Sequence, residues 1–167
     1  MGAARGPEGR HDPPGRQGGF VVEWREAFRT GIADLDAEHQ QLFALVKGLE
    51  PDKATQLLAA LVEYIVTHFT HEEALMARSG YPGLRQHVEM HEALSARVSE
   101  FLVGGTGWSG ERVQALRSFL NKWLVEHILT HDLAFGRWYH AAVPETEPLP
   151  LREEPEGSWF DRLRGKR

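Results

Sequence analysis

Histidines recur along this chain at spacings that suit metal coordination. The sequence holds nine histidines and no cysteine, so imidazoles and carboxylates are the available ligands, a set that suits iron, zinc, copper or manganese. Residues four apart in a helix lie about 40° apart on one face, one turn along. Two pairs with this spacing and two single histidines lie on the apolar stripes of four segments: His68 with Glu72, His87 with His91, His39, and His127.

A lone histidine on an apolar face is more often a core residue bonded to a backbone carbonyl than a metal ligand. Five histidines on four apolar stripes are different, because each buried polar group left unpaired costs roughly 1–3 kcal/mol. One shared metal cluster would satisfy all of them together. The core of a helical bundle is also where facing helices build such sites.

Several common metal and phosphate sites are excluded by the sequence. A single zinc ion takes about four ligands, which would leave some of these groups without a role. The zinc protease pattern H-E-x-x-H is absent, since neither His71 nor His91 has a second histidine at the required spacing. The only Glu-x-x-His pair, Glu8 with His11, lies near the N-terminus and outside the residues with helical periodicity, and no phosphate-binding G-x-x-x-x-G-K-[ST] loop occurs. A histidine-rich, carboxylate-bridged site for two metals remains.

Four segments with helical periodicity must position these side chains. Turn-forming residues separate them, at 80–83 and at 104–107, and Ser109 is placed to cap the last helix. Helices of this length joined by short loops pack as antiparallel neighbours. The predicted fold is all-α, an antiparallel up-down-up-down four-helix bundle, with helices over about residues 34–49, 51–79, 84–103 and 109–139.

Both ends of the chain differ in composition from the predicted bundle domain at residues 21–142. Residues 1–20 are rich in Gly, Pro and Arg, lack the apolar run of a secretory signal, and are predicted to be a disordered arm. Residues 143–157 form an acidic, proline-rich linker, and residues 158–167 combine large apolar and basic side chains. This basic aromatic segment is a candidate for docking on a partner protein, a protein shell or an anionic membrane surface.

The amino-acid composition also indicates which partners and which cellular location to expect for this chain. The chain of 167 residues carries a net charge of −5, which argues against nucleic acid as the main partner. No run of 18 apolar residues occurs, so no transmembrane segment is expected. A cytoplasmic location is the default expectation for a chain without cysteine.

The order and spacing of these residues resemble those of the bacterial hemerythrins. That family's motif H…H-x-x-x-E…H-x-x-x-H…H-x-x-x-x-D reads here as His39, His68 to Glu72, His87 to His91, and His127 to Asp132. The resemblance covers roughly residues 22–140 and includes every ligand position of the motif. Four further features resemble the family: Trp24, Gly31, Asp36 and the break at Gly80-Tyr81.

The resemblance implies two iron ions (Fe2+/Fe3+) bridged by an oxo or hydroxo oxygen. One iron would be held by three histidines: His87, His91 and His127. The other would be held by two: His39 and His68. Two carboxylates would bridge the pair: Glu72 and Asp132. O2 would bind at the open position of the two-histidine iron, in a pocket lined by Trp123, Leu124 and Ile128.

The resemblance further implies reversible O2 binding, for carriage, storage or delivery, and no enzymatic activity. Two other hypotheses stay open from the sequence. The same irons would support ferroxidase, peroxidase or nitric-oxide chemistry in an enzyme. A sensor of O2 or redox state would have to act through a partner, because the chain contains no recognisable signalling domain.

The bridging role of Asp132 conflicts with regular helix geometry. In an α-helix His131 lies about 40° from His127, whereas Asp132 lies about 140° away. Two ferrous ions need anionic bridges, however, and a neutral imidazole normally binds one metal. We therefore expect the fourth helix to be irregular between His127 and Asp132, loosened locally as in a π-bulge, with His131 turned away from the irons. His71 is predicted to lie on the flank or surface of its helix.

Overall fold

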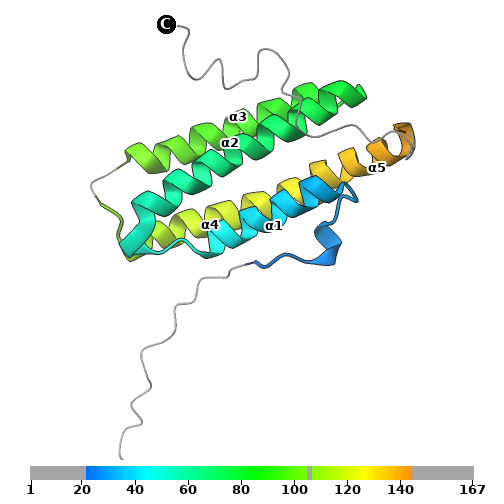
Figure 1. The fold of residues 1–167 in the computed structure, drawn as a ribbon. Coiled ribbons are helices and arrows are strands. Elements are labelled where there is room, and N and C mark those ends of the chain that lie inside the picture. The colour runs from blue at the N-terminus through cyan, green and yellow to red at the C-terminus, as the bar shows by residue number, and fades with distance from the viewer. Residues whose placement is uncertain (1–21, 105–106, 144–167) are drawn as a thin grey trace, which may run out of the picture.

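The computed structural model describes residues 22–104 and 107–143, and every regular element in these ranges is helical. The predicted all-α four-helix bundle is confirmed (Figure 1). Its long helices are α1 (Ala33–Lys47), α2 (Ala54–Ser79), α3 (Leu84–Val103) and α4 (Gly110–His127). Shorter elements complete the described chain: the 3-10 turns η1 (Glu26–Phe28) and η2 (Pro51–Lys53), the π-helical turn η3 (Ile128–Asp132), and α5 (Leu133–Ala142).

The long helices form two layers, α2 with α3 and α1 with α4 (Figure 1). Helix α1 packs on both α2 and α4, and α2 packs on α3. Because short connections join consecutive helices, each runs antiparallel to the one before it. The turn η3 follows α4 without a break and leads directly into α5, which contacts α2. The fourth helix of the bundle therefore consists of three consecutive elements.

Local capping chemistry sets the helix ends. Ser109 caps α4 as predicted, since its hydroxyl accepts a hydrogen bond from Arg112 N at 3.2 Å. The first helix ends at Lys47, two residues before the predicted end at Leu49. The second begins at Ala54 instead of residue 51, because η2 forms a 3-10 turn first.

Gly80 ends α2 at the predicted break. It has a φ of +72°, in the left-handed region where a side chain is strained. The chain then closes as a Schellman-type cap, in which Tyr81 N donates to Met76 O at 2.9 Å. This cap reverses the chain so that α3 returns along α2.

Asp36 fixes the segment that precedes α1. Its Oδ1 accepts hydrogen bonds from Thr30 N at 2.7 Å and Thr30 Oγ1 at 2.8 Å, and its Oδ2 accepts one from Gly31 N at 3.2 Å. Gly136 of α5 packs against the same segment, and a Cβ at that position would lie 2.4 Å from Thr30 O. The segment is therefore held by α1 and α5 together.

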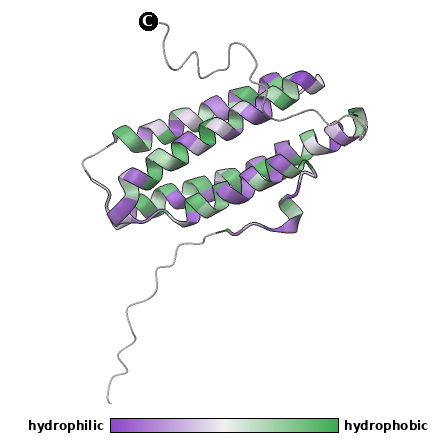
Figure 2. Cartoon of the chain, in the orientation of Figure 1, coloured by the Kyte–Doolittle hydropathy of each residue, from purple (hydrophilic) through white to green (hydrophobic). Residues whose placement is uncertain are grey.

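Hydrophobic and hydrophilic residues alternate along every helix (Figure 2), as expected for amphipathic helices around a common interior. Two apolar clusters fill that interior. The larger spans much of the bundle, and the smaller consists of Leu35, Leu75, Met76, Phe135 and Tyr139. A layer of buried polar residues lies between them: on α1, His39 falls between Leu35 of the smaller cluster and Leu42 of the larger.

Across residues 22–104 and 107–143, no helix has the length and apolar character needed to cross a bilayer. The predicted arm at residues 1–20, and residues 144–167 of the predicted linker and docking segment, lie outside the described residues. The domain limits drawn from the sequence therefore stay predictions.

Candidate metal centre

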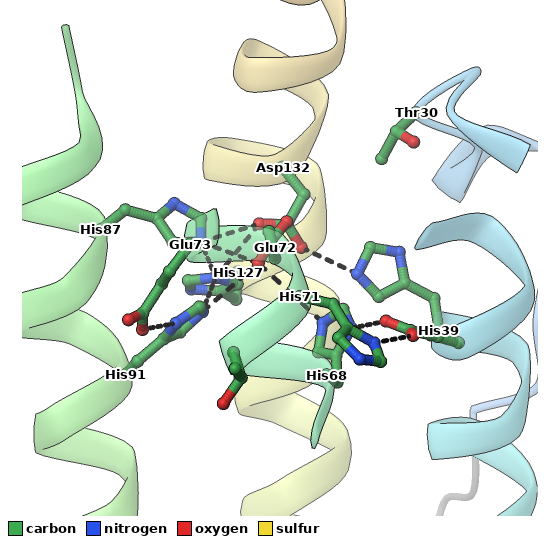
Figure 3. A network of polar contacts seen from close by, with 12 residues as sticks. Thr30, His39, His68, His71, Glu72, Glu73, His87, His91, His127 and Asp132 are labelled. Atoms are coloured by element: carbon green, nitrogen blue, oxygen red, sulfur yellow. Dashed lines mark hydrogen bonds and ion pairs between the residues drawn. The ribbon is translucent and has the colours of Figure 1, made fainter. Parts of the chain in front are cut away.

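The seven predicted ligands meet in the buried polar layer, and they come from α1, α2, α3, α4 and η3 (Figure 3). The four-residue spacing within α2 and within α3 brings two side chains from each helix to the same level. Each ligand residue has at most 5% of its surface exposed: His39, His68, Glu72, His87, His91, His127 and Asp132.

The ligand atoms fall into two groups that share one carboxylate, and within each group all of them lie within 4.8 Å of one another. The larger group comes from Glu72, His87, His91 and His127. The smaller comes from His39, His68 and Glu72. This is the same division of the histidines that the resemblance to the hemerythrins implies, although the assignment of each residue as a ligand stays a prediction.

The three imidazoles of the larger group face one another. His127 Nε2 lies 3.1 Å from His87 Nε2 and 3.2 Å from His91 Nε2. Ligand atoms at about 2.1 Å from one ion and at right angles to each other are separated by roughly 3 Å. Glu72 Oε2 lies 3.0 Å from His87 Nε2 and 3.5 Å from His91 Nε2. These four atoms thus have the spacing of donors around one cation.

Asp132 reaches both groups because the fourth helix departs from α geometry. The π-helical turn at Ile128–Asp132 confirms the predicted irregularity. In such a turn residues five apart share a face, so Asp132 lies on the face of His127. Asp132 Oδ1 lies 3.1 Å from His127 Nε2 and 3.5 Å from His87 Nε2, whereas its Oδ2 lies 3.3 Å from His39 Nε2. The carboxylate therefore spans the two groups.

His131 lies beside the cluster instead of in it. Its ring centroid is 5.4 Å from that of His127 and 6.4 Å from that of His87. The residue is partly exposed, and it supplies no atom to either group of ligand atoms. The π turn thus places Asp132 where a regular helix would have placed His131.

Two carboxylates behind the ligands orient the imidazoles. His91 Nδ1 donates to Glu73 Oε1 at 2.8 Å, and His68 Nδ1 donates to Glu38 Oε2 at 2.9 Å. Because an ionised carboxylate only accepts, each of these rings carries a proton on Nδ1. The lone pair of a neutral ring is then on Nε2, the atom that faces the cluster, as metal coordination requires.

Neither of these carboxylates was among the site residues predicted from the sequence. Each is adjacent to a predicted ligand, Glu38 before His39 and Glu73 after Glu72. Adjacency to a ligand is the signal that the sequence contains, but it does not say which imidazole the carboxylate reaches. Only the packing of α1 on α2 and of α2 on α3 brings each acid to a ring on a neighbouring helix.

At two residues of the cluster, His91 and Asp132, electrostatics favour the protonation state that metal binding requires. Burial, together with repulsion from His87 and His127, lowers the pKa of His91 well below its ordinary value of 6.5. Burial favours the neutral form of Asp132, but His127 and His39 outweigh it and hold the pKa of this acid well below 3.8. At neutral pH the metal-free cluster therefore contains a neutral His91 and an ionised Asp132.

His39 and His87 behave in the opposite sense. Burial disfavours their charged forms, yet nearby carboxylates outweigh it and raise the pKa of each above 6.5. For His39 the main partner is Asp132, and for His87 it is Glu72. Protons on these two rings compete with a cation for the same nitrogen atoms.

Several buried polar atoms of the cluster have no hydrogen-bond partner within the described residues. They are Nδ1 of His39 and Oε1 of Glu72, together with Nε2 of His39 and both oxygens of Asp132, whose contacts are the ion pairs of 3.1 Å, 3.3 Å and 3.5 Å described above. An unpaired buried polar group costs roughly 1–3 kcal/mol, and more when it is charged. Cations among these atoms would remove the cost, and imidazole nitrogen with carboxylate oxygen suits iron. The residues present therefore fit a pair of metal ions.

The three residues predicted to line an O2 pocket lie close to His127 in the sequence: Trp123 and Leu124 belong to α4, and Ile128 directly follows His127. Leu124 and Ile128 are buried, and Trp123 is half-buried with its ring stacked on that of His127 at a centroid distance of 4.3 Å. All three belong to the larger apolar cluster or pack against it. Core packing is thus part of their role, and contact with O2 stays a prediction.

Comparison with known proteins identifies the same family as the motif. The hemerythrin HHE cation binding domain matches residues 30–139. A bacteriohemerythrin of Pseudomonas aeruginosa is 31% identical over 147 residues, which cover 83% of this chain and 92% of that protein. The myohemerythrin of Riftia pachyptila is 34% identical over 113 residues, covering 67% of this chain and 88% of that one.

A solved structure extends the likeness to three dimensions. The crystal structure of a wild-type hemerythrin superposes with a TM-score of 0.60 at 25% identity, covering 71% of this chain and 97% of the other. The fold of this hemerythrin and the match to the family domain are both consistent with the buried cluster of histidines and carboxylates described above. The chain belongs to the hemerythrin family.

Proposed function

We propose that this protein binds O2 reversibly at a non-haem di-iron centre, for oxygen carriage, storage or delivery. The observation that supports this most is the pair of buried ligand groups that share Glu72 and are spanned by Asp132. A site for a single ion would leave one of the two groups of buried imidazoles without a metal. Membership of the hemerythrin family supports the choice of iron and O2.

In this proposal each group of imidazoles holds one iron. The three-histidine ion would be held by His87, His91 and His127. The two-histidine ion would be held by His39 and His68. The bridging carboxylates would be Glu72 and Asp132, and an oxo or hydroxo oxygen would complete the bridge. Because the second ion would have fewer protein ligands, it is the one that would bind O2.

A bound ferrous pair supplies the electrons that O2 takes up on binding and returns on release. The surrounding residues keep that exchange reversible. Five neutral imidazoles and only two carboxylates donate less charge than the ligand set of a carboxylate-rich centre, so cleavage of the O–O bond is less favoured. Leu124 and Ile128, both buried, would help to keep water from the bound O2.

An enzyme that performs ferroxidase, peroxidase or nitric-oxide chemistry at the same irons is the alternative. Optical spectra of the anaerobically reconstituted ferrous protein separate the two. A carrier gives the bands of an oxygenated form, loses them under argon, and regains them over repeated cycles. A single conversion to the diferric state that argon does not reverse, with turnover of an added substrate, would replace this proposal with the enzyme.

The C-terminal residues 158–167 and the cytoplasmic location also belong to this proposal. Large apolar side chains among basic ones suit a docking segment, which an acidic, proline-rich linker would hold away from the bundle. In this view the segment positions the O2-binding domain on a partner or surface and takes no part in binding O2.

A further inference from the structure

One carboxylate on α1 receives hydrogen bonds from two histidines of α2. Glu38 Oε2 accepts from His68 Nδ1 at 2.9 Å, and Glu38 Oε1 accepts from His71 Nδ1 at 2.6 Å. Both oxygens of this carboxylate are therefore occupied by imidazole donors. His68 points to the metal cluster with its Nε2, whereas His71 lies on the outer flank of the same helix.

The hydrogen bond from His68 to Glu38 is of the kind that orients metal-binding histidines. It keeps the proton of His68 on Nδ1, so the Nε2 lone pair is free to face the site. Nε2 of this ring lies 3.9 Å from Glu72 Oε2, on the side of the smaller ligand group. The orientation of Glu38 thus determines both the tautomer and the direction of His68.

Glu38 needs support to hold this orientation. Its side chain keeps 16% of its surface exposed, so solvent competes for the carboxylate. His71 is 20% exposed and binds the oxygen that His68 does not use. A carboxylate fixed at both oxygens is unable to rotate toward solvent without breaking a second hydrogen bond, and charge-assisted bonds of this kind are strong ones.

In the two-histidine group, a hydrogen bond at Nδ1 orients only one of the two imidazoles. The other imidazole of the group, His39, has no hydrogen-bond partner at Nδ1 within residues 22–104 and 107–143. Of the two imidazoles in this group, His68 is therefore the one whose ring is oriented by a hydrogen bond at Nδ1. His71 contributes to this orientation through Glu38, from the helix flank where the sequence predicted it to lie.

We propose that His71 is a positioning residue, which clamps Glu38 so that His68 presents Nε2 to the two-histidine metal. This inference rests on the proposed function for the identity of the metal, but its hydrogen-bond geometry exists in the metal-free protein. Neither His71 nor Glu38 supplies an atom to the two ligand groups. Their effect is on how firmly one of the two ions is held.

The first test uses the metal-free protein and is independent of iron. Long-range proton–nitrogen NMR of the full chain reports which ring nitrogen of His68 carries the proton. The wild type should show a slowly exchanging Nδ1 proton. His71→Phe removes the second donor, so the His68 signal should shift toward a mixture of tautomers and exchange faster. His71→Asn places an amide donor near the position of Nδ1 and should restore much of the wild-type signal.

The second test measures release of ferrous iron from the anaerobically loaded protein to a colorimetric chelator. Loss of support behind a ligand typically weakens metal affinity about 10–100-fold. His71→Phe should therefore accelerate one of two release phases by about tenfold or more and leave the other unchanged. His131→Gln is the matched control, because it alters a second partly exposed histidine beside the cluster that contributes no ligand atom.

The outcomes separate this inference from the proposed function. A wild-type tautomer and wild-type release in His71→Phe would overturn the clamp. Equal acceleration by His131→Gln would overturn it as well, because the effect would then be one of general packing. If the wild type takes up no iron, the proposed function fails, and the NMR comparison still decides whether His71 holds Glu38 and His68. Thermal unfolding of each variant confirms that the bundle is intact.

Discussion

Protons and metal ions compete for the same nitrogen atoms in the cluster. The pKa values of His39 and His87 lie above 6.5 because carboxylates face both rings. The same carboxylates are the groups proposed to bridge the metals. The metal-free protein therefore uses protons to balance the charge that two cations would balance in the loaded state.

This competition predicts the pH dependence of metal loading. A raised pKa means that His39 and His87 stay protonated at pH values where free imidazole is neutral. Affinity for ferrous iron should therefore fall as pH falls through these raised values, by about tenfold per pH unit for each proton displaced. Competition against a chelator of known affinity, from mildly acidic to mildly alkaline pH, measures it. A flat profile would contradict the assigned charge states.

The choice between Asp132 and His131 gives a second prediction at this scale. Asp132→Ala removes the carboxylate that spans both ligand groups, so the second metal should be lost and the di-iron optical bands with it. His131→Ala removes a ring that lies 5.4 Å from His127 between ring centroids and supplies no ligand atom, so the bands should remain. Metal analysis and absorption spectra of the two variants check this. The reverse pattern would show that the ligand assignment fails at this position.

The candidate ligands could be predicted from the sequence, but the residues that orient them could not. Histidines and carboxylates at helical spacing on apolar faces indicate a cluster, since burial of so many imidazoles requires a shared partner. Glu38 and His71 look like ordinary flank residues in the sequence. Their connection to His68 depends on the packing of α1 on α2, which periodicity does not specify.

At the scale of elements, the π turn is the feature that adapts a regular bundle to its site. It adds one residue to a helical turn, and this extra residue brings Asp132 under His127. Helical periodicity alone favours His131 at this place. The irregularity was predictable because two cations require an anionic bridge, so chemistry and not propensity indicated it. The 3-10 turn η2 carried no such signal, and the start of α2 was placed three residues early.

The contact between α5 and the segment before α1 gives a prediction about stability. A Cβ at Gly136 would lie 2.4 Å from the backbone oxygen of Thr30, which is itself held by Asp36. Gly136→Ala should therefore lower the free energy of unfolding by about 1–3 kcal/mol, as overpacking does. Chemical denaturation of the metal-free protein measures this change.

Gly110 provides the control for this substitution. It lies at the start of α4, and a Cβ there would meet nothing within 4 Å. Gly110→Ala should leave the free energy of unfolding unchanged or raise it slightly. Equal destabilisation by both substitutions would show that the close approach at Gly136 is not what matters.

At the scale of the whole molecule, the polar cluster lies between two apolar clusters. This arrangement shields the site from water along the bundle, but it also leaves buried polar atoms without partners in the metal-free protein. The bundle itself was predictable, because amphipathic periodicity, short turns and a cap at Ser109 all indicate the same fold. The division of the core into two clusters was not, since it depends on how the four helices align.

Removal of residues 144–167 tests whether the C-terminal segment belongs to the O2-binding unit. The residues of the two ligand groups and of both apolar clusters lie within residues 22–104 and 107–143. The truncated protein should therefore keep its iron content and its oxygenation spectrum, and lose association with any partner or anionic liposome that the full chain binds. Unfolding of the bundle or loss of iron on truncation would make the segment part of the domain.

Anomalous diffraction at the iron absorption edge, from crystals of the reconstituted protein, tests the central claim most directly. Two peaks should lie in the buried polar layer, one bonded to His39 and His68 and the other to His87, His91 and His127. Glu72 and Asp132 should lie between them. A single peak, or two peaks of which one lies outside these residues, would contradict the di-iron centre and with it the proposed mode of O2 binding.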